Sequence, residues 1–167
     1  MDINSLRLIL FFGTLAAMFC IETWKPRRVW QTPRLRRFSF HMTTSIVNTV
    51  ITRAVCMAPF LALLWWSNEN AWGLAHWLKL DGIVEIIATI IVLDLFDYWW
   101  HRFNHHVPFL WRFHRYHHMD THVDVTTALR FHPGELVLSF IAKAIWVLIW
   151  GPSIFAFALF ETLITVY

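Results

Sequence analysis

The chain has 167 residues, of which 57% are hydrophobic and 15% are charged, and its formal net charge is +3. This is too little charge to cover a water-soluble domain of that size, so the composition excludes an ordinary soluble enzyme. Eleven tryptophans and fifteen phenylalanines against five glycines and six prolines also exclude a disordered chain. We therefore expect one all-α integral membrane domain over residues 1–167, built as a helical bundle.

Three apolar segments are long enough to cross a bilayer as helices, and they cover residues 6–24, 42–66 and 83–100. Residues 67–82, between the second and the third, are mixed in polarity and carry tryptophans spaced as on a short interfacial helix. The sequence thus predicts three membrane-spanning helices with a short interfacial segment between the last two.

A basic run fixes the expected orientation. Six of the fourteen lysines and arginines lie within residues 25–37, directly after the first predicted span. By the positive-inside rule this segment is a cytoplasmic loop, and the N-terminus lies on the opposite side. Two further crossings bring residues 101–132 to the cytoplasmic face. Because the cations cluster beside a span, they indicate membrane orientation, and we expect no nucleic-acid partner.

The last apolar stretch, over residues 136–166, is split by the helix-breaking pair Gly151-Pro152. Each of the two arms has about fourteen residues, which is short for a full crossing at 1.5 Å per residue. We therefore expect a helical hairpin that dips into the bilayer and returns to the cytoplasmic face.

Histidine is the outlier in the composition, because eight of the ten histidines lie between residues 101 and 132. On a helix His101 and His105 lie one turn apart on the same face, which is the spacing that lets two imidazoles share a metal. Pro108 interrupts this helix. The next helix places a second set on one side: His114, His117 and His118.

Two kinds of role compete for these histidines. A single histidine at a membrane interface is usually structural, and we assign His41, His76 and His106 to that class. Eight histidines in two clusters with ligand spacing predict a metal site instead, and solvated or interfacial histidines are the alternative.

Two acidic residues continue the face of His101 along the predicted helix. Asp97 precedes His101 by one turn, so we expect its carboxylate to orient that imidazole without binding the metal itself. Asp94 extends the same face and is a second candidate for this role. The alternative is that both aspartates cap a helix or pair with cations.

The ligand types narrow the choice of metal. The clusters contain no cysteine or methionine, which argues against a copper(I) carrier or a thiolate zinc site. A haem protein needs only one or two axial histidines, not a dense cluster. Five or more histidines exceed the four ligands of one structural zinc, so two metal ions that share the ligand set are expected at the membrane surface.

Three segments carry a resemblance to a known family: DYWWHRFNH (97–105), LWRFHRYHH (110–118) and DVTTALRFHP (124–133). They resemble the first two histidine boxes, and the segment behind them, of the fatty acid hydroxylase and sterol desaturase superfamily. The resemblance implies an integral membrane oxidoreductase with two non-haem irons that uses O2 to hydroxylate or desaturate a lipid, with zinc as the alternative metal in isolated protein.

The resemblance also implies roles for individual residues and partners. The iron ligands it implies are His101, His105, His114, His117 and His118. His122 and His132 have no box counterpart and are secondary candidates for binding the metal or orienting a ligand. The substrate it implies is a sterol, a fatty acyl chain or an alkylglycerol. Electrons come from an external donor of the reductase, cytochrome or ferredoxin type, because the chain has no glycine fingerprint for a dinucleotide.

The family has a third box of the form His-x-x-His-His after the helical hairpin, and the given sequence stops at Tyr167. We therefore expect the chain to be an N-terminal fragment of a fatty acid hydroxylase-like domain. The alternative is a reduced, non-catalytic homologue that binds metal or lipid.

Overall fold

The computed structural model describes residues 3–27 and 32–164. The described residues form helices and no strand, which confirms the all-α prediction. In chain order the elements are α1 (Ile3–Trp24), α2 (Arg34–Thr52), a π-helical turn η1 (Arg53–Met57), α3 (Ala58–Glu69), α4 (Leu74–Trp77), α5 (Gly82–His106), α6 (Pro108–His118), a 3-10 helix η2 (Val125–Leu129), α7 (Pro133–Trp150) and α8 (Ile154–Leu163).

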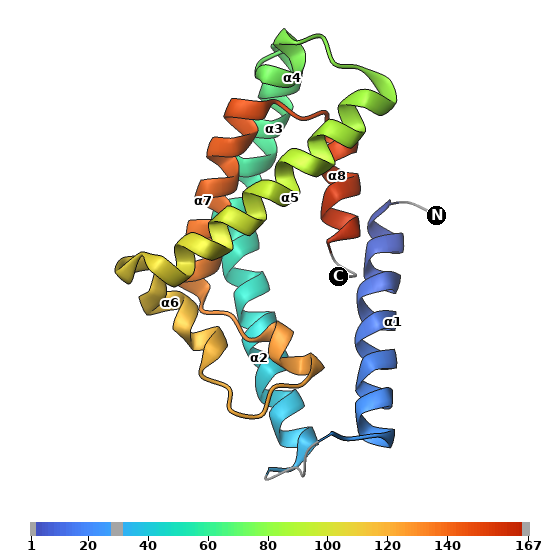
Figure 1. Ribbon diagram of the computed structural model, residues 1–167, viewed down its shortest axis with the longest axis vertical. Coiled ribbons are helices and arrows are strands. Elements are labelled where there is room, and N and C mark those ends of the chain that lie inside the picture. Colours follow the sequence, from blue (N-terminus) through green and yellow to red (C-terminus); the bar gives the residue numbers. More distant parts are fainter. Residues whose placement is uncertain (1–2, 28–31, 165–167) are drawn as a thin grey trace.

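The second predicted span is part of one long rod made of α2, η1 and α3 (Figure 1). The rod begins at Arg34, so the prediction that the basic run is a loop as far as Arg37 was wrong. Pro33 precedes the first turn, where its fixed φ favours a helix start. Side-chain partners then hold the basic first turn in place, because Arg34 pairs with Glu22 of α1 at 3.0 Å.

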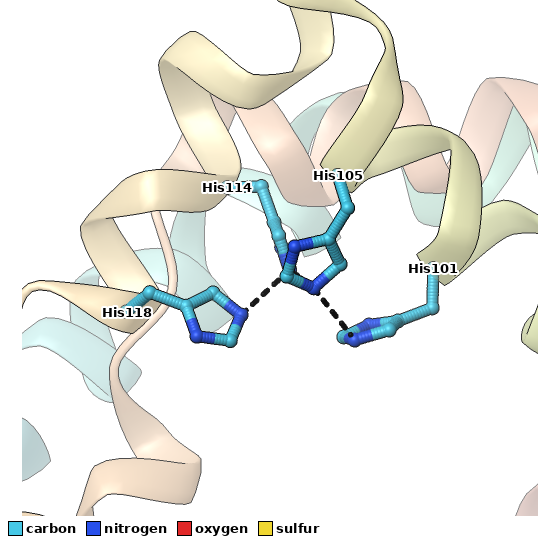
Figure 2. A group of neighbouring side chains, drawn as sticks. All are labelled: His101, His105, His114 and His118. Atoms are coloured by element: carbon cyan, nitrogen blue, oxygen red, sulfur yellow. Dashed lines mark hydrogen bonds between the residues drawn. The ribbon is translucent and has the colours of Figure 1, made fainter.

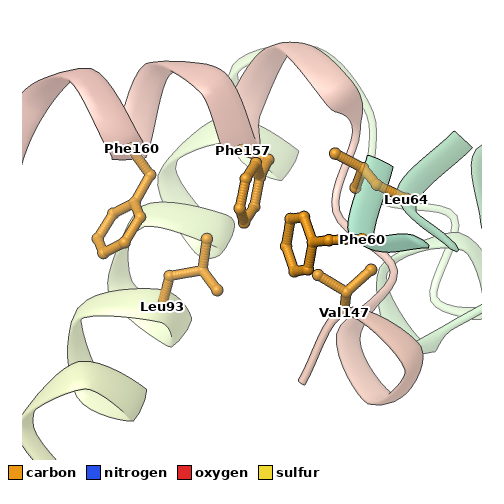
Figure 3. Close-up of a cluster of buried hydrophobic side chains, with 6 residues drawn as sticks. All are labelled: Phe60, Leu64, Leu93, Val147, Phe157 and Phe160. Carbon is orange, nitrogen blue, oxygen red and sulfur yellow. The ribbon is translucent and has the colours of Figure 1, made fainter. Parts of the chain in front are cut away.

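A buried apolar cluster joins four helices around the hairpin. Figure 3 shows it between α3, α5, α7 and α8. Its members are Phe60, Leu64, Leu93, Val147, Phe157 and Phe160, all at most 8% exposed. The close packing of these side chains gives van der Waals contacts that hold α7 and α8 against the rod and α5.

The predicted hairpin is present, with its turn at Gly151 between α7 and α8. Gly151 has φ +67, and Gly73 with φ +111 packs directly against it, since a Cβ on Gly73 would lie 2.5 Å from the Gly151 Cα. Both positions therefore need glycine. The predicted arm lengths were wrong for α7, whose 18 residues extend about 27 Å at 1.5 Å per residue. The longer arm arises because α7 begins already at Pro133.

Different segments of the chain lie at the two ends of the bundle. At one end Glu85 accepts hydrogen bonds from the backbone N–H and hydroxyl of Ser153, which ties the start of α5 to the hairpin turn. At the other end Arg37 donates to Asp120, in the loop after α6. The basic segment and the histidine-rich helix therefore share one end, and the segment 67–82 lies at the opposite one.

Two stretches of the described helices are long and apolar enough to cross a membrane: one within Arg34–Trp77, and Pro133–Trp150. The first contains the predicted span 42–66, whereas the second was assigned to the hairpin. The apolar stretch Leu8–Trp24 of α1 is shorter. α5 combines an apolar surface with Glu85, Asp94 and Asp97. Three crossings therefore remain a prediction, as does the cytoplasmic side of the histidines.

The topology can be tested by labelling single cysteines from either side of the membrane. With Cys20 and Cys56 replaced by serine, we expect cysteines at Thr32 and Thr121 to react from the same side, and a cysteine at Asn70 from the other. All three positions are exposed. Reaction of Asn70→Cys from the side of Thr32→Cys would overturn the arrangement.

Candidate metal centre

The junction of α5 and α6 brings the two histidine clusters together. Val107 is extended, with φ −89 and ψ 116, because the following Pro108 disfavours the helical conformation in the preceding residue. The chain turns there, and Pro108 starts α6. The last turns of α5 therefore face α6, and His101 and His105 lie beside His114 and His118.

These four imidazoles form one compact group, called here the four-histidine group (Figure 2). Their candidate ligand atoms all lie within 4.8 Å of one another. The Nε2 atoms of His105 and His101 are 3.1 Å apart, those of His114 and His105 3.3 Å, and those of His118 and His114 3.0 Å. Nitrogens bound tetrahedrally to one ion at about 2.0 Å lie about 3.3 Å apart, so the spacing suits a single metal ion.

Glu135, in the first turn of α7, fixes the orientation of the most buried member of this group. Its Oε1 lies 2.7 Å from Nδ1 of His114, and both residues are at most 4% exposed. Burial raises the pKa of Glu135 to about 7, and in its ionised form the carboxylate accepts a hydrogen bond, so that Nδ1 carries the proton and Nε2 presents its lone pair to the other histidines. Glu135 was not among the residues predicted from the sequence. The position of this carboxylate could have indicated its role, because it lies at the start of the helix that follows residues 124–133, one of the segments that resemble the family.

The histidines of α6 are suited to bind a metal at neutral pH. Removal of water from the rings, and then repulsion from neighbouring imidazoles, lowers the pKa of both His114 and His118 from 6.5 to about 4. Both are therefore neutral at pH 7 and keep a lone pair for a metal ion.

His117, the fifth predicted ligand, lies beside this group and outside it. Its Nδ1 donates to the backbone carbonyl of Arg130 at 3.2 Å, and its ring stacks on Phe131 with centroids 4.8 Å apart and planes at 8°. The contact to the carbonyl leaves Nε2 as the nitrogen with a lone pair. The structure thus brings together four of the five predicted ligands and orients the fifth separately.

The secondary histidine candidates have local partners. His132 is the N-cap of α7, where its Nδ1 accepts a hydrogen bond from the N–H of Gly134 at 3.0 Å. His122 lies in the loop after α6, with Nδ1 3.0 Å from the hydroxyl of Thr121. Neither belongs to the four-histidine group.

Asp97, which the sequence predicts to orient His101, has a different partner in the structure. The Asp97 carboxylate lies 3.9 Å from Nζ of Lys143 on α7, which also pairs with Glu161 on α8 at 2.7 Å. No hydrogen bond joins Asp97 to His101 within the part of the chain that the structure describes. Asp97 is drawn away because an ion pair satisfies its charge inside an apolar bundle better than a neutral imidazole does. Asp94 is exposed and also lies outside the four-histidine group.

A buried polar clamp holds the loop between α6 and α7. Arg37 of α2 binds both carboxylate oxygens of Asp120, at 3.0 and 2.8 Å, and lies 3.4 Å from Asp124. The side chain of Asp124 caps η2. Nδ1 of His41 lies 2.7 Å from the hydroxyl of Thr126, and its Nε2 lies 3.4 Å from a carboxylate oxygen of Asp120. His41 is thus structural, as predicted. Burial alone would raise the pKa of Asp120, but hydrogen bonds from Arg37 and from the His122 backbone hold it at about 2.

The comparisons with known proteins match this region. The family model described as fatty acid hydroxylase matches residues 86–167. That stretch contains the four-histidine group and Glu135. Over this stretch, just under half of its length, the chain is similar to the fatty acid hydroxylase family. Alkylglycerol monooxygenase of Danio rerio is 33% identical over 97 residues, which cover 58% of this chain and 18% of that relative.

The chain thus matches less than a fifth of the length of this curated relative. No solved structure matches it significantly. The family and the relative support a role within lipid hydroxylases and desaturases and an association with membranes. The resemblance that the histidine boxes carry in the sequence is confirmed.

Two matched substitutions compare the roles of the carboxylates. Glu135→Gln keeps the size of the side chain but removes the charge that holds the Nδ1 proton of His114, so we expect about 10- to 100-fold weaker metal binding. Asp97→Asn should leave metal affinity unchanged. Competition with a chelator, measured on purified protein, gives both affinities. A larger loss in Asp97→Asn than in Glu135→Gln would restore the role that the sequence predicted for Asp97.

Proposed function

We propose that the chain carries part of the metal centre of an O2-dependent membrane monooxygenase that hydroxylates a lipid. The observation that carries the proposal is the four-histidine group with Glu135 behind it, inside the segment that matches the fatty acid hydroxylase family. A histidine ligand whose other ring nitrogen binds a carboxylate is the usual arrangement at protein metal sites.

The residues of the group fit an iron ion. His114 holds its proton on Nδ1, so its Nε2 lone pair faces the Nε2 atoms of His105 and His118 at 3.3 and 3.0 Å. Facing lone pairs at these distances repel unless a proton or a cation lies between them. An all-imidazole set suits iron and zinc, and the absence of sulfur ligands disfavours copper(I).

Each residue has a definable task in this proposal. A bound iron would supply the activation of O2, and the protein would supply ligand geometry and an approach for the lipid. His114 and Glu135 form the buried side, whereas His101, His105 and His118 are exposed and leave the other side open. Trp111 borders the open side, with its ring 5.4 Å from that of His105 and 5.9 Å from that of His118.

We further propose that a second iron uses His117. Its orientation by the Arg130 carbonyl leaves one nitrogen free for a metal, as in His114. The substrate class we propose is an alkylglycerol, on the basis of the relative's name. We also propose that an external donor supplies the electrons.

The test is oxygen transfer to a lipid. Membranes from a host without its own alkylglycerol monooxygenase, containing the chain extended through a third histidine box and supplied with iron and a reductant, should transfer 18O from 18O2 into an added alkylglycerol. The variant His114→Ala/His118→Ala should not. The same 18O content of the lipid with the wild type and the variant would refute the proposal.

A further inference from the structure

A cationic surface lies next to the four-histidine group. Arg112 and Arg115 are exposed on α6, and Arg102 is exposed near the end of α5. Residues 98–119 contain no aspartate or glutamate. Among the described residues, none of these three arginines forms an ion pair with a carboxylate. The surface therefore carries three positive charges that the described chain does not neutralise.

The acidic residues on either side of this segment are engaged elsewhere. Asp97, which directly precedes it, lies 3.9 Å from Nζ of Lys143. Asp120 is buried in the clamp with Arg37, and Glu135 is buried against His114. Neither can turn outward to the arginines without giving up a short hydrogen bond. A partner that neutralises the surface must therefore bring its own negative charge.

Exposed aromatic and apolar side chains accompany the arginines. Arg115 stands at i+4 from Trp111 and at i+3 from Arg112, so it lies beside both on the surface of α6, and the ring of Trp111 also lies 6.1 Å from that of buried His114. Trp111 is 36% exposed and Phe109 is 56% exposed. α6 lies at the edge of the bundle, as Figure 1 shows. Arginine alternating with tryptophan and phenylalanine is typical of a helix that lies in the headgroup region of a membrane.

We propose that this basic face, made of Arg102, Trp111, Arg112 and Arg115, binds the phosphate groups of anionic phospholipids. The arginines match the charge of the phosphates, and the exposed rings enter the boundary between headgroups and acyl chains. The aromatic side chains favour a lipid surface over an acidic protein, because the apolar rings are buried only if the partner offers an apolar layer. The proposal does not depend on a bound metal or on catalysis.

Trp111 provides a native reporter for this contact. The full chain is reconstituted in nanodiscs that contain either brominated phosphatidylglycerol or brominated phosphatidylcholine at equal mole fraction. The emission of Trp111 is obtained as the difference between the wild type and Trp111→Phe. We expect brominated phosphatidylglycerol to quench this emission more strongly, with an apparent preference of about fivefold for each arginine.

Charge-neutral variants give the decisive comparison. Arg112→Gln/Arg115→Gln should reduce the preference about 25-fold, to the share of Arg102. Both replaced side chains are exposed. The matched control Arg27→Gln/Arg36→Gln removes two exposed charges outside this face. It should keep the preference for phosphatidylglycerol. High salt should weaken the preference of the wild type. Equal quenching of the wild type by both lipids would overturn the proposal and would favour an acidic protein as the anionic partner.

Discussion

The variant His114→Ala is expected to lose nearly all of the iron that the wild-type chain binds. His114 is the buried centre of the four-histidine group, where its Nε2 lies within 3.3 Å of two other ring nitrogens. Its removal deletes one ligand and also leaves the Glu135 carboxylate buried without its partner. We expect the loss in affinity to exceed the roughly 100-fold upper range for outer-shell residues. Elemental analysis after detergent purification measures it.

His106→Ala is the matched control for this loss. His106 is exposed, and its Nδ1 contacts the backbone carbonyl of Arg102, not another histidine. This variant should keep the iron content of the wild type. Equal iron in His114→Ala and in the wild type would remove the ligand assignment.

The second large effect concerns stability. Arg37→Met removes the cation from the buried clamp and leaves Asp120 without its bidentate partner, although the Asp120 side chain is only 3% exposed. Breaking a buried ion pair by removing one partner costs about 3–5 kcal/mol. We therefore expect a clear fall in the thermal unfolding midpoint in detergent. Arg36→Met, next to it and exposed, should change the midpoint little.

The clamp also predicts a dependence on pH. The pKa of Asp120 is about 2 in the folded chain, below its usual 3.8. The folded state therefore binds fewer protons than the unfolded state, and the contribution of Asp120 is complete above about pH 4 and is lost toward pH 2. In Arg37→Met this loss toward low pH should disappear or reverse, because burial without the arginine raises the pKa of Asp120, so that the folded state no longer binds fewer protons than the unfolded state. Unfolding midpoints between pH 2 and 6 measure the difference. Parallel curves for the wild type and Arg37→Met would contradict it.

Local patterns allowed much of the fold and site to be predicted. The break at Pro108 and the four-residue spacing of His101 and His105 are properties of one or two helical turns, so the sequence contains them. The hairpin at Gly151 is equally local, because a residue with positive φ ends the helix. Those features correspond to α5, α6 and the turn between α7 and α8.

Contacts between distant segments could not be predicted in this way. Glu135 meets His114 across 21 residues, and Arg37 meets Asp120 across 83. Helical periodicity gives the face on which a side chain lies but not the helix that packs there. Asp97 shows the consequence, since its spacing from His101 suggested an orienting role, whereas the packing of α7 brings Lys143 to it instead.

X-ray absorption at the iron edge tests most directly whether the four histidines hold the metal. On the iron-loaded chain we expect a first shell dominated by imidazole nitrogens, with the multiple-scattering signature of the rings. His114→Ala/His118→Ala should lose that signature. A wild-type spectrum explained by oxygen ligands alone, or one unchanged in this variant, would contradict the metal centre proposed here.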